Sequence, residues 1–164
     1  MTTVTKKSLK VGKYVDTAHV DQVVRNYKKE RWLQNSLRIG KEDSLSAWYS
    51  VEELEEFIQK IKQYDADGIK LYFGAYPEDY TERPEYASRQ TVVLVATKSK
   101  ETEEGLKHKD VYVTDKNGAS TIMGYNMGSI CPPFCGGFMS KSKSKHADVG
   151  LTIVDKGEEG LAII

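Results

Sequence analysis

The chain has 164 residues, a length that fits one domain and lets folding bury roughly 70% of the unfolded surface. Lys and Arg number 24 in total, as do Asp and Glu, so the net charge is zero and does not draw the chain to nucleic acid or anionic lipid. No apolar run follows the first lysines, which argues against a secretory signal or membrane span there and predicts a cytoplasmic protein without membrane association.

Residues 16–35 are predicted to form a helix. Asp16 or Thr17 can cap it, and Gly40 ends the pattern that follows it. Its apolar residues recur at helical spacing: Val20, Val23, Val24 and Tyr27. Residues 1–16, which precede it, are predicted to be flexible.

A second helix is predicted over residues 50–64. Ser50 and Glu53 have the spacing of a capping box, glutamates fill the first turns, and Lys60 and Lys62 lie near the end, where the helix dipole favours positive charge. One apolar stripe runs along it: Val51, Leu54, Phe57, Ile58 and Ile61.

Strands follow the helices. Residues 69–76 alternate, which predicts a strand that buries Ile69, Leu71 and Phe73 on one face. Residues 91–97 are apolar without alternation, as in a central strand covered on both faces. Asn117-Gly118 predicts a hairpin turn, and residues 148–154 a last strand.

This order predicts an α+β fold in which two amino-terminal helices pack on a mainly antiparallel sheet of four or five strands. No repeat or linker divides the chain, so residues 1–164 are expected to form a single domain. The low-complexity segment within residues 139–146 is predicted to be flexible.

Motifs for catalysis are missing from the sequence. No phosphate-binding loop, nucleophile elbow or HExxH pair occurs. The segments DADG and DKNG resemble the start of a calcium loop but lack its first acidic ligand and its final glutamate. We therefore predict no catalytic residue and no cofactor.

Charge is unevenly distributed near the amino terminus. Residues 1–41 carry ten basic residues against three acidic ones, and residues 42–62 carry six acidic against two basic. The favoured interpretation is that the basic helix and the acidic helix complement each other. Nucleic-acid binding by the basic helix, with Tyr27 and Trp32 stacking on bases, is a weaker alternative.

The two cysteines, Cys131 and Cys135, leave four interpretations open. Three residues separate them, two of them proline, which is not the spacing of a thioredoxin-type pair. An ordered turn with free thiols is favoured. A local disulfide, a metal site that adds His146, and a catalytic thiol are the alternatives, although a fourth zinc ligand is not evident.

The surrounding stretch GYNMGSICPPFCGG predicts a stiff, extended loop. Pro132 and Pro133 restrict the residues before them, glycines flank the segment, and Phe134 is the expected anchor. A loop of this kind with an aromatic tip suits a contact surface. We predict that seven residues bind a ligand or partner: Tyr72, Tyr76, Tyr125, Asn126, Pro132, Pro133 and Phe134.

Three segments, DGIKLYFGAYPE, TVVLVAT and YNMGSICPPFC, resemble segments shared by a set of small uncharacterised bacterial proteins. The resemblance covers residues 44–137. It implies a bacterial cytoplasmic protein and segments that meet in space, and it brings no activity or ligand.

Two functional classes follow from these observations. The first is a non-enzymatic binding or interaction module for a protein or small-molecule partner. The second is a thiol- or metal-dependent protein centred on Cys131, Cys135 and His146.

Overall fold

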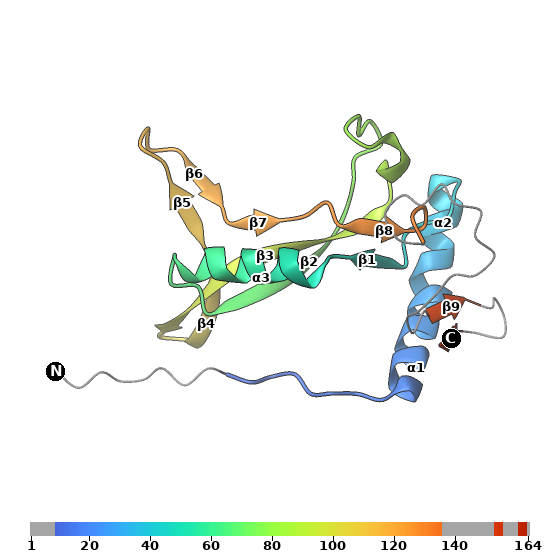
Figure 1. The fold of residues 1–164 in the computed structure, drawn as a ribbon, viewed down its shortest axis with the longest axis horizontal. Helices are drawn as coiled ribbons and strands as arrows, with labels where there is room; N and C mark the ends of the chain where they lie inside the picture. Colours follow the sequence, from blue (N-terminus) through green and yellow to red (C-terminus); the bar gives the residue numbers. More distant parts are fainter. Residues whose placement is uncertain (1–8, 136–152, 156–160, 164) are drawn as a thin grey trace.

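The computed structural model describes residues 9–135, 153–155 and 161–163 (Figure 1). It has the predicted α+β architecture, with helices packed against antiparallel strands. Residues 9–16 run as an extended, exposed segment, whereas the predicted flexible segment 139–146 lies outside the described residues.

The first helix is a continuous rod in three parts: α1 (Thr17–Tyr27), a π-helical turn η1 (Lys28–Trp32) and α2 (Leu33–Ile39). Asp16 caps it by accepting a hydrogen bond from the His19 backbone N–H at 2.9 Å. Gly40 ends it with a left-handed φ of 70°, as the sequence predicts. The rod contains no buried residue and stands at one end of the sheet (Figure 1).

Helix α3 (Val51–Lys62) covers a face of the sheet. Both halves of the predicted capping box are present, with Ser50 and Glu53 exchanging side-chain and backbone hydrogen bonds. The helix buries Phe57 and Ile61 against Leu94 and Ala96 of the sheet, and these residues form the main core.

The main sheet is antiparallel. Its order is β2 (Gly68–Ala75), β3 (Gln90–Thr102) and β4 (Gly105–Asp110), while β7 (Gly124–Tyr125) pairs with β3 on the edge opposite β2. Residues 94–97 of β3 are all buried, which confirms the prediction of a central strand covered on both faces.

Three two-stranded pairs complete the described strands. Strands β5 (Tyr112–Thr114) and β6 (Ser120–Ile122) form the hairpin predicted around Asn117-Gly118, which projects from the body (Figure 1). Strand β1 (Ser46–Trp48) pairs with β8 (Ser129–Cys131), and β9 (Ile153–Asp155) pairs with β10 (Leu161–Ile163). A short 3₁₀ turn, η2 (Pro84–Tyr86), lies in the loop between β2 and β3.

Strand β2 corrects one prediction. Ile69 is half-buried, but Leu71 is 62% exposed and Phe73 is 83% exposed, so the predicted buried face is largely open. Helix α3 packs on β3 and on Tyr125 of β7, which lies on the other side of β3 from β2. The apolar residues of β2 therefore share the face that carries α3, and the helix covers that face at Ile69 but not at Leu71 or Phe73.

Candidate functional site

The seven predicted binding residues lie in three separate places. Tyr125 belongs to the main core, where its ring stacks on Phe57 at 5.3 Å and its hydroxyl donates to Glu53 at 3.1 Å. Burial and this neighbouring carboxylate raise the pKa of Tyr125. Tyr72 lies on the other face of the sheet, and the remaining five gather at the far end of the molecule.

That end holds a cluster of aromatic rings, which we call the tyrosine cluster: Tyr76, Tyr80, Tyr86 and Phe134. Tyr76 lies 4.7 Å from Tyr80 and 5.4 Å from Tyr86, and Tyr86 lies 5.8 Å from Phe134, between ring centroids. Phe134 thus anchors the Pro-Pro loop on the fold, although it stays 45% exposed. The cluster is an interior feature, because Tyr76 is 7% exposed and Tyr86 is fully buried.

The hydroxyl groups of the cluster are bonded within the fold. Asn126 Oδ1 accepts from Tyr76 at 3.4 Å and from Thr91 at 3.0 Å. The Tyr86 hydroxyl donates to the Gly128 carbonyl at 3.2 Å and accepts from the Ile130 N–H at 3.4 Å. The side chains of Tyr76 and Asn126 therefore take part in hydrogen bonds within the fold.

Tyr86 was not among the residues singled out from the sequence. It lies in the polar loop PEDYTERPEYASRQ, whose composition indicates exposure. Arg83 lies over its ring at 5.3 Å and donates to its hydroxyl at 3.1 Å. Only the folding of that loop onto the β8 segment places this tyrosine in the interior.

The cysteines correct a second prediction. Cys131 and Cys135 form a disulfide, so the favoured interpretation of free thiols is wrong and the local disulfide is present. The loop is also held by Ser44, whose hydroxyl donates to the Pro132 carbonyl at 3.3 Å. Among the described residues no group of three potential metal ligands occurs, and His146 lies outside them.

A cleft of about 340 Å³ opens beside the tyrosine cluster, between the end of α2 and the loop that follows β2. Six residues line it: Arg38, Ile39, Ala75, Tyr76, Glu78 and Ser88. Arg89, which is 8% exposed and has an Nη1 atom without an acceptor among the described residues, does not line this cleft. The cleft therefore offers one exposed cation and one carboxylate, but no convergent polar set.

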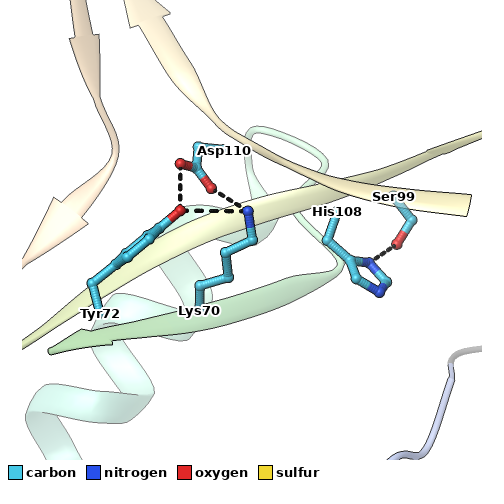
Figure 2. A network of polar contacts seen from close by, with 5 residues as sticks. All are labelled: Lys70, Tyr72, Ser99, His108 and Asp110. Atoms are coloured by element: carbon cyan, nitrogen blue, oxygen red, sulfur yellow. Dashed lines mark hydrogen bonds and ion pairs between the residues drawn. The ribbon is translucent and has the colours of Figure 1, made fainter.

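Tyr72 takes part in a polar network on the face of the sheet opposite α3 (Figure 2). Asp110 accepts from Lys70 Nζ at 2.8 Å and from the Tyr72 hydroxyl at 2.9 Å. The hydrogen bond with Lys70 lowers the pKa of Asp110, and the same bond raises the pKa of Lys70. These shifts are typical of a structural ion pair, in which each charge favours the charged form of the other.

A serine and a histidine are also adjacent on this face (Figure 2). His108 Nδ1 lies 2.9 Å from Ser99 Oγ, and Ser99 donates to Asp67 Oδ1 at 3.1 Å. A hydroxyl has one proton, and Ser99 uses it in the hydrogen bond to Asp67. The Ser99 oxygen must then accept its second hydrogen bond from His108 Nδ1. A nucleophilic serine needs the reverse, a base that accepts its proton, so this arrangement does not fit covalent catalysis.

The basic helix uses its two aromatic residues within the fold. The Tyr27 hydroxyl donates to Gln90 Oε1, and Trp32 Nε1 donates to the Asp43 carbonyl at 2.7 Å. Burial raises the pKa of Tyr27. These contacts fix the rod against the sheet and leave neither ring fully open for stacking on a base.

One edge of β2 pairs with no other strand among the described residues; this edge, which we call the free edge, is a candidate site that the sequence did not single out. The N–H and C=O of Ala96 bond Met123 and Val111, on the side of β3 away from β2. Ile69, which is paired with Ala96, therefore directs its own N–H and C=O outward. Because bonded residues alternate in an antiparallel pair, Leu71, Phe73 and Ala75 do the same.

Comparisons of the chain with protein-family models, with curated proteins and with solved structures found no significant match. Among the described residues, no helix is both long enough and apolar enough to span a membrane.

Proposed function

We propose that the protein is a non-enzymatic interaction module that binds a protein partner by strand addition along the free edge of β2. The observation that supports this proposal is that outward-facing backbone groups coincide with exposed apolar side chains. Residues 69, 71, 73 and 75 present the backbone groups, and Leu71 and Phe73 are exposed. Strand addition combines main-chain hydrogen bonds with contacts to alternate side chains, and this edge supplies both.

A contrast within the same sheet strengthens the proposal. Proteins protect sheet edges with charge, proline or bulges, because a bare edge pairs with other chains. Strand β4 carries Lys107 and Lys109, directly opposite Lys100 and Lys98 of β3. Strand β2 contains neither proline nor acid, and its one charged residue, Lys70, is already bonded to Asp110. Strand β2 is thus the less protected edge.

The second functional class, a thiol- or metal-dependent protein centred on the two cysteines, has less support. A thiol-dependent activity needs a thiolate, and both cysteines are bonded to each other. The cytoplasmic location and bacterial origin expected from the sequence remain part of the proposal, and they rest on the three resembling segments.

The test compares the proteins retained by the immobilised full chain with those retained by two edge variants, Leu71→Lys and Phe73→Lys. Leu106→Lys is the matched control, because Leu106 is also an exposed apolar strand residue, at 43%, but lies on β4. We expect specific partners to be lost from both edge variants and kept by the control. Retention of the same partners by all three variants would contradict the proposal.

A further inference from the structure

We infer that the partner of the β2 edge is a second copy of this chain, which pairs with it antiparallel about a two-fold axis at Leu71. This inference rests on the proposed function, since it names the strand that occupies the same edge. The pairing would join the two main sheets into one continuous sheet.

The backbone groups of β2 fit this pairing. A two-fold axis at Leu71 sets Leu71 opposite the second copy's Leu71, and Ile69 opposite the second copy's Phe73. All three belong to the set whose N–H and C=O face outward, so each of these pairs can exchange two hydrogen bonds. The same surface serves both copies, as a two-fold interface requires.

The side chains of β2 fit the same register. Residues directly opposite each other in an antiparallel pair place their side chains on one face of the sheet. Ile69, Leu71 and Phe73 of each copy would then meet their counterparts on the face that carries α3, beyond the part of it that the helix covers. Each large apolar side chain meets another one, and the exposed apolar surface of Leu71 and Phe73 is removed from water.

Charge restricts the register. An axis at Lys70 would set two lysines directly opposite each other, which is destabilising. An axis at Leu71 instead sets Lys70 opposite the second copy's Tyr72, and within one chain Lys70 already lies 5.8 Å from the Tyr72 ring centroid and pairs with Asp110. No like charges face each other along β2 in this arrangement.

One segment of the chain competes for the edge. Residues 9–15 are extended and exposed, with Val11 91% exposed and Tyr14 fully so, and an extended segment of this kind can add to a sheet edge. It carries Lys10 and Lys13, which would add positive charge beside Lys70. We therefore assign the edge to β2 of a second copy, and the test treats the amino-terminal segment as a separate outcome.

Sedimentation velocity and light scattering, measured from micromolar to millimolar concentration, test the inference. The samples are the full chain, Leu71→Lys, Phe73→Lys, the control Leu106→Lys and a chain that lacks residues 1–15. We expect the full chain, the control and the truncated chain to dimerise with similar affinity. Each edge variant should weaken the dimer about a hundredfold, because it buries a charge without a partner at the pair. A non-reducing gel without covalent dimers confirms that shuffled disulfides do not contribute.

Amide hydrogen exchange measures the pairing of β2 residue by residue, and its dependence on protein concentration distinguishes dimerisation from a folding defect. Protection of the Leu71 and Phe73 amides should rise with the concentration of the full chain. Protection of the Lys70 and Tyr72 amides, which face β3, should stay high throughout.

Each result has one meaning. A full chain that stays monomeric overturns the second-copy inference, and the proposed function still stands if the edge variants lose partners that the control retains. A dimer that survives both edge substitutions overturns the inference, as does a dimer that needs residues 1–15. Edge-independent dimerisation together with edge-independent partner binding would overturn both proposals.

Discussion

The ring of Tyr49 lies so close over Gly128 that a Cβ atom added to Gly128 would come within 2.5 Å of Tyr49 Cζ. Tyr49 connects the helical side of the fold to the sheet, since its hydroxyl donates to the Val92 carbonyl at 3.2 Å and its ring lies 5.8 Å from that of Tyr125. Burial raises the pKa of Tyr49, in keeping with this enclosed position. Gly128 is therefore required by packing.

We expect Gly128→Ala to lower the free energy of unfolding by about 2 kcal/mol or more, because neither the buried backbone nor the ring can move aside cheaply. Gly124→Ala is the control, since its nearest neighbouring atoms lie 3.8–4.0 Å away. Urea denaturation measures both. Equal stability of the two variants would contradict the close contact.

The capping box of α3 makes a second prediction. Ser50→Ala should lower the free energy of unfolding by about 1 kcal/mol, because it leaves the Glu53 N–H without its 3.1 Å acceptor. Ser120→Ala, at an exposed strand position, is the control. Thermal denaturation followed by far-ultraviolet circular dichroism is the measurement, and an unchanged midpoint for Ser50→Ala would argue against the cap.

The same box predicts how stability depends on pH. The hydrogen bond from the Ser50 backbone N–H lowers the pKa of Glu53, and the bond from Lys70 lowers the pKa of Asp110. A carboxyl whose pKa is lower in the folded state stabilises the fold above its unfolded pKa. Its contribution is lost as the pH falls from about 4.5 through the lower folded value. Glu53→Gln should flatten this acid limb, which unfolding curves across that pH range would show, whereas Gln at the exposed Glu55 should leave it unchanged.

The ends of the helices could be predicted from neighbouring residues in the sequence. The burial of a strand face by a distant helix could not. Ser50 and Glu53 specify the start of α3 through contacts three residues apart, and Gly40 specifies the end of α2 by its own φ. The alternation in β2 predicts a strand with two different faces, but it does not say how far a helix covers the apolar one. That depends on α3 packing over β3 and β7, which long-range pairing decides.

The candidate site shows the same division. The position of Phe134 as anchor of the Pro-Pro loop could be predicted, because it is the large apolar side chain next to the two prolines. The burial of Tyr86 could not, because it requires a polar loop to fold back onto Gly128 and Ile130. The spacing of Cys131 and Cys135 permits a disulfide without selecting it over free thiols.

Removing the Tyr86 hydroxyl tests whether the tyrosine cluster is structural. Tyr86→Phe should cost about 1–3 kcal/mol of the free energy of unfolding, since it leaves the buried Gly128 carbonyl and Ile130 N–H without the partner that now bonds both. Tyr112→Phe is the control, because Tyr112 is 60% exposed. If Tyr86→Phe unfolds at the same denaturant concentration as the unmodified chain, the buried hydroxyl has no structural importance.

The disulfide leads to a prediction about the stability of the fold and about the cellular compartment of the protein. The bond between Cys131 and Cys135 closes a loop with a separation of four residues, so the double variant Cys131→Ser, Cys135→Ser should lose no more than about 2 kcal/mol of stability. Partner binding through β2 should be unchanged in the double variant, because neither cysteine belongs to β2 or pairs with it. Loss of binding would instead favour the thiol-centred alternative.

Alkylation followed by intact-mass measurement tests whether the two cysteines are bonded in the cell. A reducing cytoplasm keeps thiols open, so two alkylated cysteines in protein quenched directly from its own cells support the cytoplasmic prediction, and an unreactive pair assigns the protein to an oxidising compartment.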